Sequence, residues 1–138
     1  MSHKAQAIVQ TCIDFRFRKA LNTFIENELN LHSIDLKMDD GGVKMIFEEG
    51  PIREWIFNNY QTSFDSHGIE RVILINHQDC GAYGGSKVHE SLDKEIESHE
   101  IQLRHAVSIV RAKFADKQIE AYLALINPEG EVLFKKVI

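Results

Sequence analysis

Two short runs of residues in this sequence combine side chains that could bind a metal ion. The run Cys-Ile-Asp-Phe-Arg begins at Cys12, and the run His-Gln-Asp-Cys extends from His77 to Cys80. Two thiolates and one imidazole are a donor set that suits zinc, and three protein ligands leave a fourth position open, as catalytic zinc requires. The His-x-x-Cys spacing also allows one tight turn to present both of its side chains to the same ion. The chemistry that this combination predicts is zinc binding with one position left for other groups.

The composition is that of one small domain with its own core. The chain has 138 residues, 43% of them hydrophobic, so we expect a single domain over 1–138. Its formal net charge of −5 argues against a dedicated nucleic-acid binder, which needs a basic face. The apolar runs are far too short to span a bilayer and the N-terminus lacks a signal pattern, so we expect no membrane partner and a cytoplasmic location. In that reducing compartment the two cysteines are free thiols, ligands or nucleophiles.

Strand and helix patterns alternate along the chain. Apolar or alternating runs predict strands, and apolar residues at helical spacing predict helices. The expected strands lie at 7–9, 34–38, 71–75, 121–126 and 131–137, and the expected helices lie at 21–29, 51–67 and 91–114. Pro51 suits a first helical turn, and Gly68 suits a helix end. This order predicts an α/β fold with a mainly parallel central sheet flanked by helices and a C-terminal antiparallel hairpin strand.

These elements can bring the two runs together. The run at Cys12 follows the first strand, and the run at His77 follows strand 71–75, which we expect to be central. Open α/β sheets bind their ligands beyond the carboxyl ends of their strands. If the two strands are neighbours, Cys12, His77 and Cys80 converge on one point.

The complete signature is Cys-x-Asp-x-Arg from Cys12 followed by His-x-x-Cys-Gly from His77. In this order, with each half closing a strand, the signature resembles that of the β-class carbonic anhydrases, and the order of elements is similar over nearly the whole chain. The resemblance implies Cys12, His77 and Cys80 as ligands of one Zn²⁺ per chain, with Asp14 and Arg16 as a dyad beside the metal. It also implies a lyase that hydrates CO₂ reversibly to bicarbonate through zinc-bound hydroxide.

The dyad also makes physical sense by itself. Asp14 can accept a hydrogen bond from zinc-bound water and so direct a lone pair toward the substrate. Arg16 can hold Asp14 ionised and oriented through a charge-assisted contact. In the similar family the counterpart of Asp14 can also become the fourth ligand, so both an open and a closed site remain compatible with the sequence.

The substrate pocket is predicted by position only. The candidate residues are Phe15, Gly41, Gly42, Val43, Gly81 and Tyr83. Gly81 could also direct a backbone N–H at bicarbonate. The loop at 40–43 reads Asp-Gly-Gly-Val where the family usually has Gly-Asn, and only a few residues precede the first strand, whereas the similar enzymes carry an N-terminal helical arm that clasps a partner subunit.

Other functions stay open at this point. A zinc protein without CO₂ turnover results if Asp14 permanently fills the fourth position, and the same zinc hydroxide could act on a related small electrophile such as COS or CS₂. Cys12 and Arg18 also satisfy Cys-x5-Arg, the phosphate-binding loop of cysteine phosphatases. That loop needs small residues, whereas this one contains a carboxylate and two aromatic rings, and the phosphatase reading leaves His77 and Cys80 unexplained.

The remaining expectations concern assembly and two single residues. The apolar stripe at 91–114, together with Trp55 and Tyr60, exceeds what one small sheet can cover, which predicts a homodimer or a higher homo-oligomer. His99 on this stripe is expected to be a core or interface histidine. Asp79 is expected to be a turn residue.

Overall fold

Five strands form a single sheet in the computed structural model, which describes residues 3–138. The strands are β1 (Ala7–Thr11), β2 (Ile34–Met38), β3 (Arg71–His77), β4 (Gln118–Ile126) and β5 (Val132–Lys136). Their order is β2-β1-β3-β4-β5, and the pairing is parallel except between β4 and β5. The predicted mainly parallel sheet with an antiparallel hairpin strand is therefore confirmed. Residues 1 and 2, which belong to the predicted domain, lie outside the described residues.

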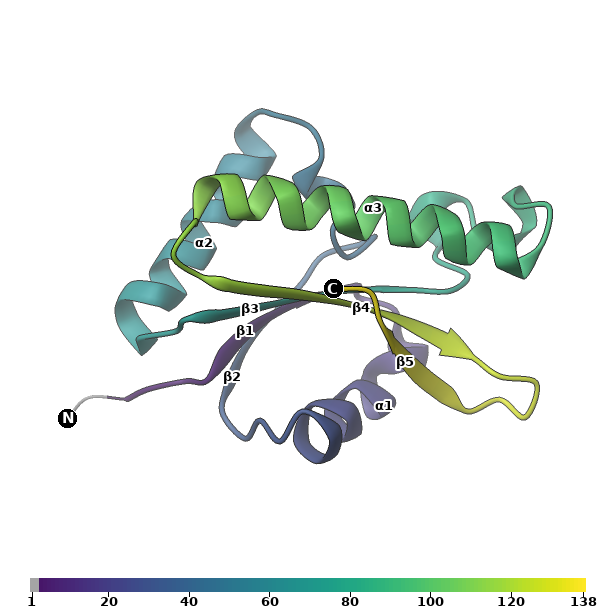
Figure 1. Ribbon diagram of the computed structural model, residues 1–138, viewed down its shortest axis with the longest axis horizontal. Helices are drawn as coiled ribbons and strands as arrows, with labels where there is room; N and C mark the ends of the chain where they lie inside the picture. The colour runs from purple at the N-terminus through teal and green to yellow at the C-terminus, as the bar shows by residue number, and fades with distance from the viewer. Residues whose placement is uncertain (1–2) are drawn as a thin grey trace.

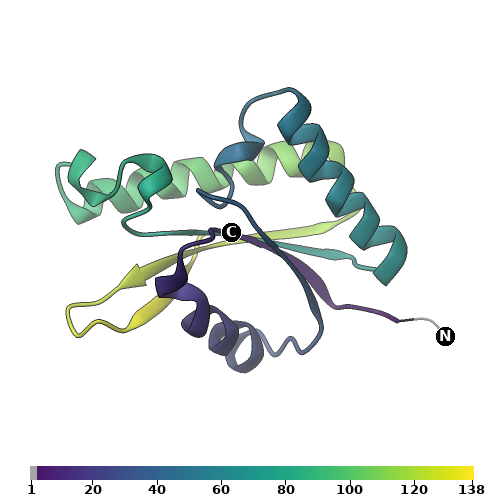
Figure 2. The same cartoon turned by 180° about the vertical axis from the view of Figure 1, so that it is seen from behind.

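Helices cover both faces of this sheet (Figure 1). Helices α2 (Pro51–His67) and α3 (Leu92–Lys113) lie on one face, and the short α1 (Arg18–Thr23) lies on the other, as the view from behind also shows (Figure 2). The beginning of α3 lies over the carboxyl ends of the parallel strands (Figure 1). Among the residues that the structure describes, no helix is long and apolar enough to cross a membrane.

The side chains of the central strand explain this layering. In β3, Val72 and Leu74 join the apolar cluster under α2 and α3, whereas Ile73 and Ile75 join the cluster under α1. Successive side chains of a strand point to opposite faces, so a continuous apolar run is stable only where both faces are covered. The sequence-based expectation of a central, doubly covered strand is confirmed.

The long helices begin and end at the residues that favour such positions. Pro51 occupies the first turn of α2, and Gly68 ends this helix in the left-handed conformation with φ 63°. Ser91 caps α3, because its side chain accepts a hydrogen bond from the backbone N–H of Lys94 at 3.2 Å.

The helix predicted at 21–29 differs from the observed one. Helix α1 begins earlier, at Arg18, and after Thr23 it widens into a π-helical turn at Phe24–Glu28. The backbone N–H of Leu29 donates to the carbonyl of Phe24 at 3.0 Å, which defines the wider turn. In this form Phe24 and Ile25 are both buried against the sheet.

A buried polar group connects β1 to the loop that follows β2. Gln10 is fully buried, accepts a hydrogen bond from the Tyr60 hydroxyl at 2.8 Å, and donates to the Asp39 carboxylate at 2.7 Å. The backbone N–H of Asp39 donates in turn to the carbonyl of Thr11 at 3.0 Å. Because Thr11 is the last residue of β1, these bonds hold the loop at 39–43 beside the end of that strand.

Candidate metal centre

Strands β1 and β3 are neighbours, so the two runs singled out in the sequence meet at one edge of the sheet. Cys12 directly follows β1, His77 is the last residue of β3, and Cys80 lies in the turn after it. One ligand atom from each of these residues lies within 4.8 Å of the other two, and the Sγ atoms of Cys12 and Cys80 are 3.9 Å apart. All three side chains are buried. The condition that the sequence set for their convergence is met.

The geometry of these donors fits a tetrahedral metal ion. Two thiolates on one zinc ion at the usual bond length lie about 3.8 Å apart, close to the observed sulfur separation. The Nδ1–H of His77 donates to the carbonyl of Gln78 at 2.7 Å, so Nε2 carries the free lone pair. Nε2 is buried and has no hydrogen-bond partner within residues 3–138. A buried polar atom without a partner, placed beside two thiols, is what a metal ligand requires.

The two thiols influence each other's ionisation. A hydrogen bond from Cys80 lowers the pKa of Cys12 against the opposing effect of burial, and the backbone N–H groups of Asp14 and Gly41 lower it further. The same contact with Cys12, together with burial, raises the pKa of Cys80. The contact between the two sulfurs therefore favours one thiolate and disfavours a second, and a cation is needed for both to be thiolates.

Asp14 and Arg16 form an ion pair with several hydrogen bonds beside these donors. Asp14 caps the short turn at Phe15–Phe17 and accepts the backbone N–H of Arg16 at 2.9 Å. The Arg16 guanidinium donates to Asp14 Oδ1 through Nε at 3.1 Å and to Oδ2 through Nη2 at 2.7 Å. These bonds hold the pKa of Asp14 below its usual value, and Asp14 Oδ2 lies 3.8 Å from His77 Nε2. An ionised carboxylate thus stands next to the free nitrogen.

Asp79 shares Arg16 with Asp14, which the sequence did not predict. Arg16 Nη1 donates to Asp79 Oδ2 at 3.0 Å, and Nη2 donates to the Asp79 carbonyl at 2.9 Å. The backbone N–H of Ser86 and Arg16 together lower the pKa of Asp79. Asp79 does lie in the turn, with φ 58°, but its carboxylate also contacts the predicted dyad. Its position between His77 and Cys80 is the one signal in the sequence that could have indicated this role.

A cavity of about 390 Å³ opens onto this group of residues. Its lining residues are Cys12, Ile13, Asp14, Phe15, Arg16, Asp40, Cys80, Gly81 and Ala82. Phe15 is 86% exposed and Ile13 is 59% exposed, so the rim of the cavity is apolar. Of the residues predicted for a substrate pocket, Phe15 and Gly81 line this cavity.

The other predicted pocket residues lie elsewhere. Val43 is fully buried in the core under α2 and α3, and its backbone N–H donates to the side chain of Asn76 at 3.2 Å. Gly42 approaches the same Asn76 side chain closely. Tyr83 contacts Asn76 through its hydroxyl, whereas Gly41 directs its backbone N–H toward Cys12. None of these four residues lines the cavity, and three of them contact Asn76, which lies next to His77 in β3.

His99 is a core histidine, as expected from its place on the apolar face of α3. Burial lowers the pKa of His99 to about 4, so its imidazole is neutral at pH 7. Its Nδ1 lies 3.3 Å from Asn76 Nδ2, and as an acceptor there it leaves the proton on Nε2.

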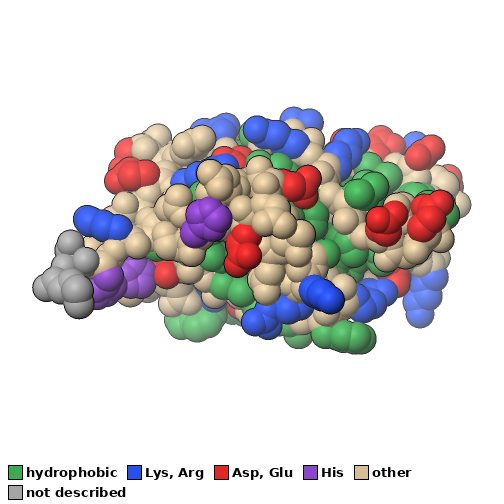
Figure 3. Space-filling view, turned by 90° about the horizontal axis from the view of Figure 1, so that it is seen from below, with side chains coloured by type: hydrophobic (Ala, Val, Ile, Leu, Met, Phe, Trp, Pro, Cys, Tyr) green, Lys and Arg blue, Asp and Glu red, His purple; other side chains and the backbone are tan. Residues whose placement is uncertain are grey.

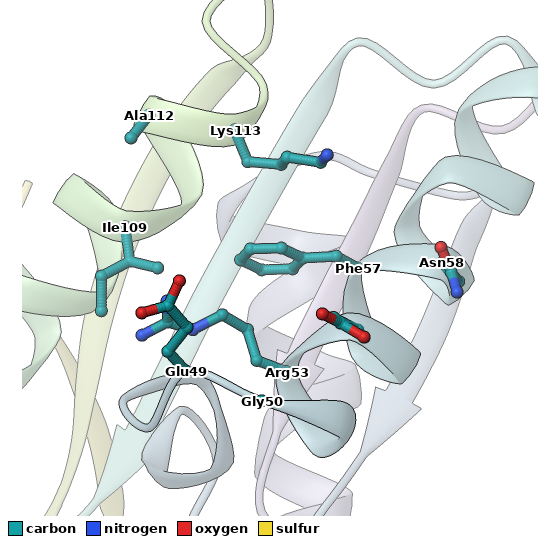
Figure 4. Close-up of a pocket in the computed structure, with 9 residues that line it drawn as sticks. Glu49, Gly50, Arg53, Phe57, Asn58, Ile109, Ala112 and Lys113 are labelled. Atoms are coloured by element: carbon teal, nitrogen blue, oxygen red, sulfur yellow. The ribbon is translucent and has the colours of Figure 1, made fainter.

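A second cavity, of about 440 Å³, lies between α2 and α3, away from the donor residues (Figure 4). Phe57 and Ile109 form its apolar wall, and Glu49, Arg53 and Lys113 stand around it. Arg53 is engaged by the carbonyls of Ile46 and Phe47. No cysteine or histidine lines this cavity, so the candidate metal chemistry belongs to the 390 Å³ cavity lined by Cys12 and Cys80.

The arrangement around Cys12 does not support a phosphate-binding loop. Arg18 is exposed and is not among the residues that line the cavity with Cys12. The acidic Asp14 lines the same cavity as Cys12, and its carboxylate would repel a phosphate there.

Comparisons with known proteins find a family and relatives that match nearly the whole chain. Residues 2–133 match a protein family described as "Putative carbonic anhydrase". An uncharacterised protein of Rickettsia bellii is 26% identical over 136 residues, which cover 94% of this chain and 81% of that protein. One from Rickettsia conorii is 24% identical over 136 residues, covering 94% of this chain and 72% of that protein.

Solved structures resemble the whole chain. The carbonic anhydrase from Glaciozyma antarctica has a TM-score of 0.63 at 16% identity, covering 100% of this chain and 85% of that one. A β-carbonic anhydrase from Trichomonas vaginalis has a TM-score of 0.63 at 15% identity, covering 99% of this chain and 84% of that one. One of two tetrameric β-carbonic anhydrases from Sordaria macrospora has a TM-score of 0.56 at 10% identity, covering 96% of this chain and 81% of that one. At these identities the structures establish the fold, which is that of the β-carbonic anhydrases. With a family match over nearly its whole length, the chain belongs to this carbonic anhydrase family.

Proposed function

We propose that the protein is a zinc-dependent lyase that hydrates CO₂ reversibly to bicarbonate, with Cys12, His77 and Cys80 as the ligands of one zinc ion. The observation that carries the proposal is the burial of three donor atoms within 4.8 Å of one another, next to the ion pair of Asp14 and Arg16. Family membership and the β-carbonic anhydrase fold support the same reaction class.

The residues of the chain have distinct roles in this proposal. When bound, zinc supplies the Lewis acidity that makes water a nucleophile near neutral pH. Asp14 stays ionised because Arg16 donates to both of its oxygens, so Asp14 accepts a hydrogen bond from water and orients it. Phe15 and Ile13 offer an apolar rim to CO₂, and the backbone of Gly81 lines the same cavity for the anionic product.

The test of the proposal combines metal analysis with a stopped-flow assay of CO₂ hydration. Protein prepared without chelators should contain about one zinc ion per chain and should hydrate CO₂ rapidly. Absence of zinc would refute the metal centre. Turnover of an aryl phosphate in the presence of EDTA would instead favour the cysteine phosphatase.

Cys80→Ser should lose zinc and lower the stability of the protein, because bound metal contributes to the free energy of folding. At a zinc concentration about 1,000 times its dissociation constant, this contribution is about 4 kcal/mol. EDTA should therefore lower the Tm of the wild-type protein and leave the Tm of Cys80→Ser unchanged. If the variant keeps its zinc and its Tm, Cys80 is not a ligand.

A second candidate function is a zinc protein without CO₂ turnover, and one contact favours it. Asp14 Oδ2 lies 3.8 Å from His77 Nε2, so this carboxylate is within a small movement of a fourth ligand position. Zinc binding without hydration at any pH would support this candidate. Turnover of COS or CS₂ by the same preparation would indicate a related small electrophile as the substrate.

We also infer a single domain, a reducing compartment such as the cytoplasm, and assembly into a homodimer or a higher homo-oligomer. Thiolate ligands require reduced cysteines, which supports the compartment. The Sordaria macrospora enzymes are tetrameric, and the exposed Phe15 and Ile13 give this chain an apolar surface that a second copy could cover.

A further inference from the structure

Glu95 is a buried carboxylate that the proposed reaction does not use. It lies in the first turn of α3 and is only 2% exposed. Its Oε2 accepts the backbone N–H of Asp79 at 2.7 Å, and its Oε1 accepts the hydroxyl of Ser86 at 2.7 Å. Both hydrogen bonds therefore go to the segment that contains Cys80.

No lysine or arginine within residues 3–138 forms an ion pair with Glu95. The nearest ionisable nitrogen is Nε2 of His99, at 3.9 Å, and His99 is neutral at pH 7 because burial lowers its pKa to about 4. Burying a carboxylate without a cation is costly unless its hydrogen bonds compensate. Glu120, the other buried glutamate of the described residues, differs because Arg71 pairs with it.

The segment held by Glu95 is strained. Asp79 has φ 58°, a left-handed conformation that residues other than glycine adopt at some cost. Ser86 donates its backbone N–H to Asp79 Oδ1 at 2.8 Å, and Arg16 donates to Asp79 Oδ2 and to the Asp79 carbonyl. Glu95 takes the remaining backbone group of Asp79, its N–H. Every polar group of this residue is thus engaged.

We propose that Glu95 is the positioning residue of the metal centre: it holds Asp79 in the left-handed turn that sets Cys80 relative to His77 and that presents the Asp79 carboxylate to Arg16. The inference rests on the proposed function, because it takes His77 and Cys80 as metal ligands. Through Asp79 and Arg16, this buried carboxylate of α3 also fixes the orientation of Asp14.

The variants that test this role are Glu95→Ala and Glu95→Gln. Glutamine keeps the hydrogen bonds, because its amide oxygen accepts the Asp79 N–H and its amide nitrogen donates to the Ser86 oxygen. Glu95→Ala should bind zinc about 10- to 100-fold more weakly, as is typical when a group that orients a ligand is lost. Glu95→Gln should bind zinc within about threefold of the wild-type affinity. Competition with a chromophoric chelator measures both affinities.

Cobalt substitution provides a second measurement, the visible absorption spectrum of bound Co²⁺, which a loss of stability alone does not change. The visible absorption of Co²⁺ bound to the wild-type protein and to Glu95→Gln should be the same, whereas Glu95→Ala should alter its band positions and intensities. Glu120→Ala is the matched control, because it also removes a buried carboxylate. Glu120 pairs with Arg71, which begins β3, whereas His77 is the last residue of that strand. Glu120→Ala should lower the Tm and leave zinc affinity and the cobalt spectrum unchanged.

The outcomes separate this inference from the proposed function. Wild-type zinc affinity and a wild-type cobalt spectrum in Glu95→Ala would overturn the positioning role, and so would equal damage in Glu95→Gln and Glu95→Ala. If Glu95→Ala does not fold, Glu95→Asp, whose shorter side chain cannot reach both partners, carries the same expectation. A wild-type protein that binds zinc but fails to hydrate CO₂ would refute the proposed function and leave these comparisons intact.

Discussion

Arg16 is placed between two carboxylates, and its planar guanidinium serves both. Nε and Nη2 donate to Asp14, whereas Nη1 and Nη2 donate to the side chain and the backbone of Asp79. An arginine has five N–H donors in a fixed fork, which a lysine at this position could not reproduce. The orientation of Asp14 is thus linked to the turn that carries Cys80.

Asp14→Asn should retain about one zinc ion per chain and lose about 100-fold in the rate of CO₂ hydration. The variant replaces the ionised acceptor, whose pKa Arg16 holds low, by a neutral amide. Zinc content and stopped-flow rates measure the two effects. Asp35→Asn is a suitable control, because Asp35 pairs with His67 at the far end of the sheet and should leave the rate unchanged. Full activity of Asp14→Asn would remove Asp14 from the mechanism.

For single residues, the sequence indicated the three candidate metal ligands but not the residues that position them. Cys12, His77 and Cys80 could be predicted because few side chains bind zinc and because their spacing is informative. Glu95 could not be predicted, since a glutamate in the first turn of an amphipathic helix usually faces water and stabilises the helix dipole. Its burial depends on contacts with Asp79 and Ser86 that only the folded chain creates.

The elements position the site through close contacts between strand ends and loops. Gly42 has φ 63°, and a Cβ atom there would lie 2.6 Å from Asn76 Oδ1 and 2.6 Å from the carbonyl oxygen of Ile75. Only a glycine lets the loop at 39–43 approach β3 this closely, next to His77.

Gly42→Ala should destabilise the protein by more than the strain of about 1–2 kcal/mol that a left-handed alanine carries. The excess comes from the backbone carbonyl of Ile75, which cannot move aside without disturbing β3. Gly130→Ala separates the two effects, because Gly130 also has a positive φ of 84° but a Cβ there would meet nothing within 4 Å. Denaturant titrations should show a clearly larger decrease in the free energy of unfolding for Gly42→Ala than for Gly130→Ala. Equal decreases would contradict the close approach of Gly42 to the carbonyl of Ile75.

Helix α3 contributes a pH dependence through His99. Burial lowers the pKa of His99 to about 4, whereas an unfolded histidine has a pKa of about 6.5. Between these values the unfolded chain binds a proton at His99 that the folded chain does not. The effect of His99 on stability is therefore absent above pH 6.5, and it lowers the free energy of unfolding as the pH falls toward 4. The slope is at most about 1.4 kcal/mol per pH unit.

His99→Gln should remove this dependence. The free energy of unfolding of the wild-type protein minus that of the variant should decrease by about 3 kcal/mol between pH 7 and pH 4. Denaturant titrations of both proteins over this range measure the difference, and effects of the proposed metal ligands cancel in it. Parallel curves would show that His99 does not titrate below its ordinary pKa.

Most strands and the two long helices could be predicted, because their apolar periodicity and end residues are local signals. The end of β3 could not. The pattern predicted an end at Ile75, whereas the strand continues through Asn76 and His77. These polar residues are buried because Val43, His99 and Gln78 provide their hydrogen-bond partners, which the local sequence does not reveal.

At the scale of the whole molecule, exposed apolar residues lie both beside the proposed site and on part of the surface that the sequence suggested. Tyr60 is fully buried, and the central residues of the α3 stripe, such as Leu103 and Val110, lie in the core. Trp55 and Phe15 remain exposed at 57% and 86%. Seen from the side of α1, acidic and basic side chains are interspersed without one continuous basic patch (Figure 3). Of the surface on which the sequence argument for an oligomer rests, Trp55 and Leu92 are exposed, whereas Tyr60 and the middle of the 91–114 stripe are buried in the core.

Light scattering at micromolar concentration should give at least twice the 15.8 kDa mass of the chain. Phe15→Glu should shift the mass toward that of a monomer, because a charge there opposes burial against a second copy. Trp55→Glu, at another exposed aromatic residue, should leave the mass unchanged. A monomeric wild-type protein would refute the proposed assembly.

The distance along the chain between the donors has a consequence for folding kinetics. Cys12 and Cys80 are 68 residues apart and meet only after β1 has paired with β3 across the intervening β2 and α2. Such non-local pairing is slow, because the entropy of closing a long loop is lost before the contacts form. A metal ion whose ligands come from the ends of both strands can bind only after the chain has passed the transition state for folding. We therefore expect bound zinc to slow unfolding and to leave the folding rate nearly unchanged, so that it prolongs the lifetime of the native state.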